Sequence, residues 1–138
     1  MKNVPKVGII TINDNLNFGN RLQNYAVQEI LNDLNVENVT NMYAMFDDVG
    51  TTAMTKLDLG NNFDTSNVTN MEAMFWATGK NKMITLNLGE KFDTSKVTDM
   101  KHMFRSTGYS KMTELNLGEK FNTINVTNMN HMFYFTGY

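Results

Sequence analysis

NVTNMEAMF, at residues 67–75, is the stretch that determines the fold, because it recurs along the chain at a constant spacing. The other copies read NVTNMYAMF at 38–46, KVTDMKHMF at 96–104 and NVTNMNHMF at 125–133, so that each begins 29 residues after the one before. Self-similarity at a fixed period of this length indicates a stacked repeat array. A single unit of this size cannot bury its own apolar residues, so we predict that neighbouring units pack into one continuous core.

Each unit is predicted to contain a short strand that ends at a glycine. Leucines alternate with polar residues at 57–59, 86–88 and 115–117, which is typical of a strand with one apolar face. The residue after each of these segments is Gly60, Gly89 or Gly118, and glycine commonly ends a strand. Because the units stack, we expect the three strands to lie side by side in a parallel sheet.

The second half of each unit is predicted to be a helix. Val68, Met71, Met74 and Phe75 have the spacing of one apolar stripe on a helix. The expected caps at the helix starts are Thr65, Thr94 and Thr123. At the helix ends stand Gly50, Gly79, Gly108 and Gly137, where a left-handed residue is favoured. The methionine columns are interpreted as flexible apolar filler between the layers.

We therefore predict an α/β fold: a short, right-handed, leucine-rich-repeat-like solenoid of 29-residue strand–loop–helix units with an N-terminal strand–helix cap. Residues 1–37 form the predicted cap and residues 38–138 the array, whose units start near 38, 67, 96 and 125, the last one incomplete. The last sheet edge is expected to be uncapped, and exposed edges invite association. We expect a marginally stable monomer or an edge-to-edge homodimer.

The array resembles a known family. FDTSNVTNM at 63–71, preceded by LDL at 57–59 and followed by MF at 74–75, is similar to the repeat of BspA-like leucine-rich-repeat surface proteins of bacteria. The resemblance covers about residues 36–138 and extends to mycoplasma-type surface lipoproteins. It implies an array outside the cell that binds proteins or cell surfaces in adhesion.

The first part of the chain resembles a second family. KVGIITI at 6–12 predicts a buried strand and residues 19–34 an amphipathic helix. VGIIT at 7–11 followed by NFGNRLQNYAVQ at 17–28 is similar to the N-terminus of polysaccharide pyruvyl transferase family proteins, over about residues 6–39. That family transfers a pyruvyl group from phosphoenolpyruvate to a sugar. The resemblance implies a remnant ligand loop at Asn17, Gly19, Asn20, Arg21 and Gln23.

Composition excludes several classes of function. The chain has 138 residues, with 12 Lys+Arg against 14 Asp+Glu and a net charge of -2, which is unlike the basic footprint of a nucleic-acid binder. It contains no cysteine, so disulfides and thiolate chemistry are excluded. No apolar run is long enough for a spanning helix and no signal peptide is recognisable, so the sequence predicts a cytoplasmic protein, whereas the BspA-like resemblance implies the cell surface.

No arrangement of residues suggests catalysis, and we expect no catalytic residue, no metal site and no cofactor. A transferase needs a second substrate site and positioned acid–base groups, for which the array leaves no room. His102 and His131 occupy one column of the repeat, and exposed side chains are favoured there over a shared metal. The polar residues that alternate with the strand leucines form a candidate partner-binding face or a plain solvated face: Lys56, Asp58, Thr85, Asn87, Glu114 and Asn116.

The function expected from these observations is a non-catalytic module for protein or cell-surface binding. Two alternatives stay open. One is a chimeric remnant of a pyruvyl transferase that has lost its catalytic lobes, and the other is a recombination product with no selected role.

Overall fold

The computed structural model describes residues 39–138. Outside the described residues lie the predicted strand at 6–12, the predicted helix at 19–34, the cap that they were to form, and the remnant ligand loop at Asn17, Gly19, Asn20, Arg21 and Gln23.

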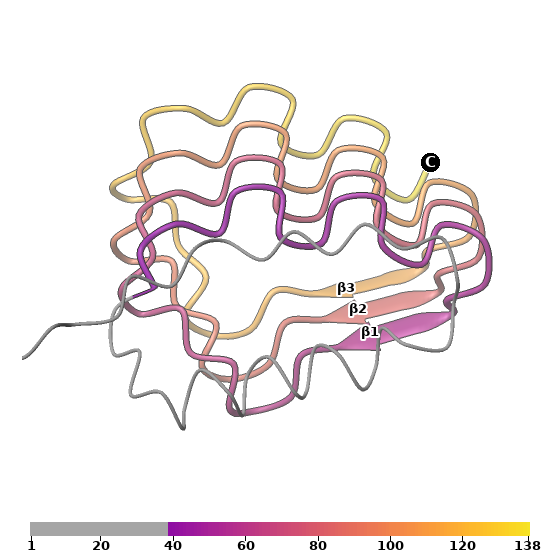
Figure 1. Cartoon of the computed structure of the whole chain (residues 1–138), viewed down its shortest axis with the longest axis horizontal. Helices are drawn as coiled ribbons and strands as arrows, with labels where there is room; N and C mark the ends of the chain where they lie inside the picture. Colours follow the sequence, from indigo (N-terminus) through magenta and orange to yellow (C-terminus); the bar gives the residue numbers. More distant parts are fainter. Residues whose placement is uncertain (1–38) are drawn as a thin grey trace, which may run out of the picture.

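A parallel sheet of three short strands runs along one side of the array (Figure 1). The strands are β1 (Lys56–Asp58), β2 (Thr85–Asn87) and β3 (Glu114–Asn116), in the order β1-β2-β3. Leu57 pairs with Leu86, and Leu86 with Leu115, so the sheet register equals the 29-residue period of the sequence. The predicted parallel sheet is confirmed, with each strand shifted by one residue toward the N-terminus.

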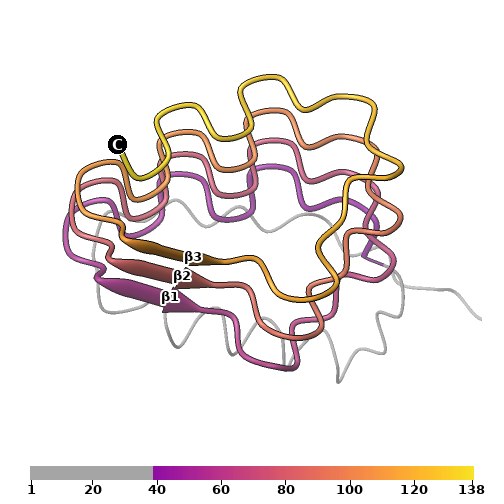
Figure 2. The same ribbon diagram turned by 180° about the vertical axis from the view of Figure 1, so that it is seen from behind.

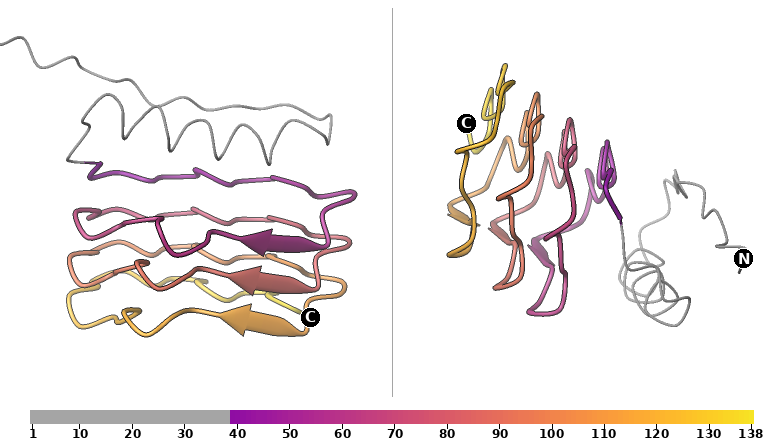
Figure 3. Two further views of the ribbon diagram at one scale, coloured as in Figure 1. Left: turned by 90° about the horizontal axis from the view of Figure 1, so that it is seen from below. Right: turned by 90° about the vertical axis from the view of Figure 1, so that its left-hand side faces the viewer.

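The same register holds on the other side of each unit. Isolated parallel bridges join Asn41 to Asn70, Asn70 to Asp99, and Asp99 to Asn128. As a result, successive units lie as layers, with each strand in line with its neighbours (Figures 2 and 3). Opposite the strands, four segments run in parallel and carry the backbone through successive turns: 43–53, 72–82, 101–111 and 130–137. We call these segments the first to fourth turn runs.

The prediction of helices in the array is wrong, because residues 39–138 contain no helix. In the first turn run, the amides of Phe46 and Asp48 donate across to Met74 and Trp76 of the next unit, at 2.8 and 2.9 Å. The amide of Asp47, which lies between them, donates to the carbonyl of Ala44, at 3.1 Å. A helix would instead bond the amides beyond its first turn to carbonyls four residues back in the same segment.

Left-handed residues explain why these segments cannot be helical. In the second turn run, Ala73 and Ala77 have φ angles of 56° and 53°, and the corresponding positions of the other runs are also positive. Positive φ at a residue other than glycine breaks a right-handed helix. Here it recurs every four residues, close to the 3.6-residue helical period, so the apolar pattern resembles a helical stripe.

The apolar columns do form the core, as predicted. Val68, Met71, Met74 and Phe75 are buried, with the last three fully so. The stacked rings of Phe46, Phe75, Phe104 and Phe133 run through all four units, with centroids 5.1–5.3 Å apart. The core is therefore a set of side-chain ladders that extends along the stack.

The threonines expected to cap helices have a different role. Thr65 donates its hydroxyl to the carbonyl of Asp93, at 2.8 Å, and its oxygen accepts the amide of Asp93, at 2.7 Å. Thr94 is bonded in the same way to Asn122. Thr123, in the last unit, is exposed. Thr65 and Thr94 therefore join one unit to the next.

The predicted left-handed glycines are confirmed, although no helix ends at them. Gly50, Gly79, Gly108 and Gly137 have φ angles of 63°, 58°, 54° and 57°. Where the chain is described, it has no helix long and apolar enough to cross a bilayer.

Candidate functional site

The predicted partner-binding face lies on the outer side of the sheet. β1, β2 and β3 each place a leucine between two polar residues, and Leu57 and Leu86 are buried while Leu115 is half-buried. The polar residues are half-buried or exposed, as expected for the solvent side: Lys56, Asp58, Thr85, Asn87, Glu114 and Asn116. The geometry of the alternation is thus as predicted.

Several of these polar groups are engaged within the array. Asp58 accepts from the amide of Gly60 at 3.0 Å, from Lys56 Nζ at 3.1 Å and from Asn87 Nδ2 at 3.2 Å. The backbone hydrogen bond from Gly60 and then the Lys56 ammonium lower the pKa of Asp58 below its ordinary value. The side-chain oxygens of Asn87 and Asn116 likewise accept the amides of the glycines that follow, at 3.2 and 3.0 Å. These three side chains hold the turns that follow the strands.

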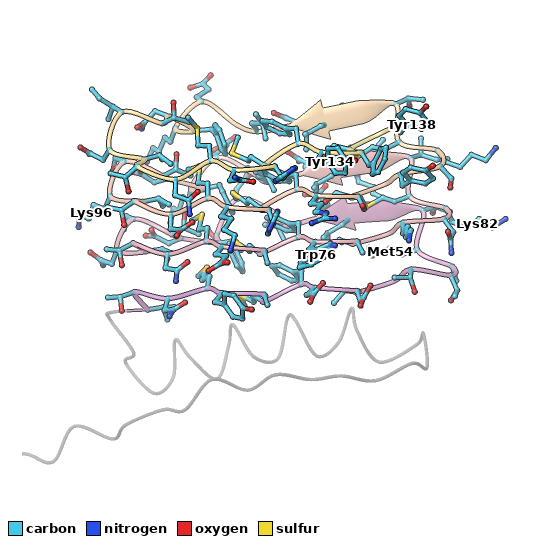
Figure 4. The ribbon with its side chains drawn as sticks, turned by 90° about the horizontal axis from the view of Figure 1, so that it is seen from above. Met54, Trp76, Lys82, Lys96, Tyr134 and Tyr138 are labelled. Atoms are coloured by element: carbon cyan, nitrogen blue, oxygen red, sulfur yellow. The ribbon has the colours of Figure 1, made fainter. Side chains whose placement is uncertain are left out.

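A different group of side chains gathers over the turn runs, opposite the sheet. Trp76, Arg105 and Tyr134 occupy the same position of three successive units. The Arg105 Cζ atom lies 5.0 Å from the Trp76 ring centroid and 5.4 Å from that of Tyr134. Figure 4 looks onto this side of the array and labels Trp76 and Tyr134. The guanidinium is therefore held between two aromatic rings.

Two histidines extend this group. The His102 ring lies 5.4 Å from Trp76 and 5.5 Å from His131, and the His131 ring meets Tyr134 edge-on at 5.1 Å. His131 is exposed, as predicted, but His102 is half-buried and its Nδ1 atom is buried without a hydrogen-bond partner in residues 39–138. We name Trp76, Arg105, Tyr134, His102 and His131 together the aromatic–arginine ladder.

Among the described residues, no group of three or more carboxylate or imidazole ligands could hold a metal ion.

Positive charge dominates the surroundings of His102. Burial, and then the nearby cations Arg105 and Lys101, lower the pKa of His102 below its ordinary value, while Glu72 opposes this effect. Glu72 is itself paired with Lys101, at 3.1 Å. A group whose pKa falls on folding takes up its proton more readily in the unfolded chain, so acid destabilises the fold through it.

We expect His102→Ala to weaken the loss of stability between pH 7.5 and pH 5. The unfolded imidazole titrates at about 6.5, so stability is highest above that value and falls as the pH drops from it toward the lower pKa of the folded state. Alanine fits here, because Ala44 and Ala73 occupy the same column with φ angles of 52° and 56°.

The measurement is the free energy of unfolding in urea for both proteins at pH 7.5 and pH 5. Equal losses in the two proteins would contradict the assignment. The carboxyl groups of Asp58, Asp64 and Asp93 have lowered pKa values and do not interfere. Their contribution to stability is lost only as the pH falls below about 3.8.

Sequence reasoning did not single out Trp76, Arg105 and Tyr134. Their signal was their place in one column of the repeat, at 76, 105 and 134, which also contains Asp47. The residue types in that column differ from unit to unit, so it does not stand out as a conserved apolar column does. Only the stacking of the units shows that the three side chains touch.

A family model described as "Mycoplasma protein of unknown function, DUF285" matches the chain twice, at residues 17–85 and 50–137. No curated protein and no solved structure matches it.

Proposed function

Because this chain belongs to the DUF285 family of Mycoplasma proteins of unknown function, we propose that it is a non-catalytic repeat module that binds a protein partner, as in adhesion at a cell surface. The BspA-like character of the repeat supports this proposal, because the family is associated with BspA-like surface repeat proteins. The leucine-rich-repeat-like solenoid is part of the same proposal, and the 29-residue register of the described units supports it.

The aromatic–arginine ladder is the observation that carries the proposal. Tryptophan, tyrosine and arginine are the residue types that most often dominate the binding energy of protein interfaces. Here all three stand in contact on the outer side of the turn runs, and 44% of Tyr134 is exposed. The polar sheet face is a weaker candidate because Asp58, Asn87 and Asn116 are bonded within the array.

The family match also bears on the first part of the chain. Its first segment, 17–85, includes the loop at Asn17, Gly19, Asn20, Arg21 and Gln23. This supports treating that loop as part of a repeat protein more than as the remnant of a transferase. We accordingly propose no chemistry for it.

The test is a selection from a displayed library of random 16-residue peptides with the full chain as bait. We expect enriched peptides that bind the purified chain saturably by fluorescence anisotropy. Trp76→Ser combined with Tyr134→Ser should abolish this binding, while Thr85→Ala combined with Glu114→Ala, on the sheet face, should leave it unchanged. Urea unfolding confirms that each variant is folded.

Two results would contradict the proposal. One is a selection that enriches no saturable binder. The other is binding that persists in the folded ladder variant and is lost in the sheet-face variant, which would move the binding surface to the strands.

A further inference from the structure

We propose that Arg105 is the receptor for a side-chain carboxylate in an acidic segment of the partner protein. This inference rests on the proposed function and names the chemistry that the ladder would recognise. It is carried by the position of the guanidinium between two rings and by the absence of any carboxylate partner for it among the described residues.

Two aromatic rings from neighbouring units approach the guanidinium of Arg105. Trp76 and Tyr134 belong to the units before and after Arg105, and the Arg105 Cζ atom lies over both rings, 5.0 and 5.4 Å from their centroids. The five N–H donors of an arginine lie in the plane of the group, at its edge. An arginine presented in this way offers the planar fork that binds the two oxygens of a carboxylate.

The backbone beneath the ladder is fixed. The amide of Arg105 donates to the carbonyl of His102 at 3.0 Å, and the carbonyl of Arg105 accepts the amide of Ala77 at 2.8 Å. Trp76 and Tyr134 close equivalent turns, with Ala73 at 3.0 Å and His131 at 3.1 Å. Because this backbone is already held in place, ordering it adds little to the entropy cost of binding.

The charges around Arg105 favour an anion. In residues 39–138 the two ion pairs join Lys56 to Asp58 and Lys101 to Glu72, so neither uses Arg105. Asp47 precedes Trp76 in the same column, and Asp48 follows Asp47 in the first turn run. An acidic segment is therefore favoured over the third turn run, which contains Lys101 and Arg105, and repelled from the first, which gives it one orientation on the array.

The experiment compares two labelled 12-residue peptides by fluorescence anisotropy with the full chain. One alternates glutamate with leucine, and the other replaces each glutamate by glutamine. We expect the glutamate peptide to bind at least about tenfold more tightly, because hydrogen bonds to charged groups are the strong ones. Raising the salt concentration should weaken this binding.

Two substitutions isolate the role of Arg105. Arg105→Gln should reduce affinity for the glutamate peptide at least about tenfold, and Arg105→Lys should recover only part of it because the planar fork is lost. Lys82→Gln is the matched control, because it also removes one positive charge, and Lys82 is an exposed residue of the second turn run. The Lys82→Gln variant should bind the glutamate peptide with unchanged affinity.

The outcomes separate this inference from the proposed function. If the library enriches binders that lack acidic residues and bind the Arg105→Gln variant with unchanged affinity, the binding function stands and the assignment of Arg105 as a carboxylate receptor is wrong. If no peptide binds at all, both are wrong. Sedimentation velocity provides the last arm: self-association of the chain that Arg105→Gln abolishes would assign the carboxylate to a second copy and overturn the partner proposed here.

Discussion

Phe75→Ala is expected to lower the free energy of unfolding by about 3–5 kcal/mol, the usual cost of removing a buried phenylalanine. The Phe75 ring is fully buried and stacks between Phe46, at 5.1 Å, and Phe104, at 5.3 Å. It also meets Phe92 at 6.3 Å. Because the ring stands between two neighbouring units, its loss opens a cavity that both would have to fill.

The matched control is Phe133→Ala, the same change in the last ring of the stack formed by Phe46, Phe75, Phe104 and Phe133. Phe133 is 45% exposed and stacks on Phe104 alone among the described rings. Removing it should cost about 1 kcal/mol, since only part of the ring leaves an apolar environment. Urea unfolding of the two variants measures the difference. Similar losses of unfolding free energy in the two variants would show that the stack of phenylalanine rings is not the core of the array.

Gly89→Ala is expected to have an effect of similar size, through backbone overlap. Gly89 has a φ angle of 82°, and a Cβ atom built there would lie 1.9 Å from the carbonyl oxygen of Gly60. The oxygen belongs to the backbone of Gly60, and the position of the Cβ atom is fixed by the backbone of residue 89, so the two units would have to move apart. We expect a loss of at least about 3 kcal/mol, or a chain that does not fold.

Gly60→Ala separates this overlap from the cost of the left-handed conformation. Gly60 has a φ angle of 67°, and a Cβ atom there would meet nothing within 4 Å. Its cost should be about 1–2 kcal/mol, the penalty for a left-handed alanine. Urea unfolding, with circular dichroism as the check for folding, compares the two. Equal losses would contradict the close approach of Gly60 and Gly89.

The layered part of the fold could be predicted because one period governs it. A constant spacing of 29 residues places Leu57, Leu86 and Leu115 side by side, and the sheet register follows. The buried columns could be predicted for the same reason. The turn runs could not, because their amides bond to the neighbouring unit, and a short apolar stripe does not distinguish this from a helix.

The candidate site could be predicted only in part. Alternation with leucine placed the polar strand residues on the solvent side, but it did not show that Asp58 is occupied by Lys56 and Gly60. The ladder depends on contacts between units, such as that of Arg105 with Tyr134. Such a contact becomes visible only when the spacing of the layers is known.

The main chain beneath the ladder is the same in every unit, whatever side chain it carries. Asp47, Trp76, Arg105 and Tyr134 each close an equivalent turn, with amide-to-carbonyl distances of 3.0–3.1 Å. Mutation can therefore exchange these outward residues, and recombination can exchange whole units, without a change in the backbone structure. Selection should hold the phenylalanine and glycine columns constant while the column of Asp47, Trp76, Arg105 and Tyr134 diverges; under the function proposed above, relatives with one architecture would then differ in the ligands they bind.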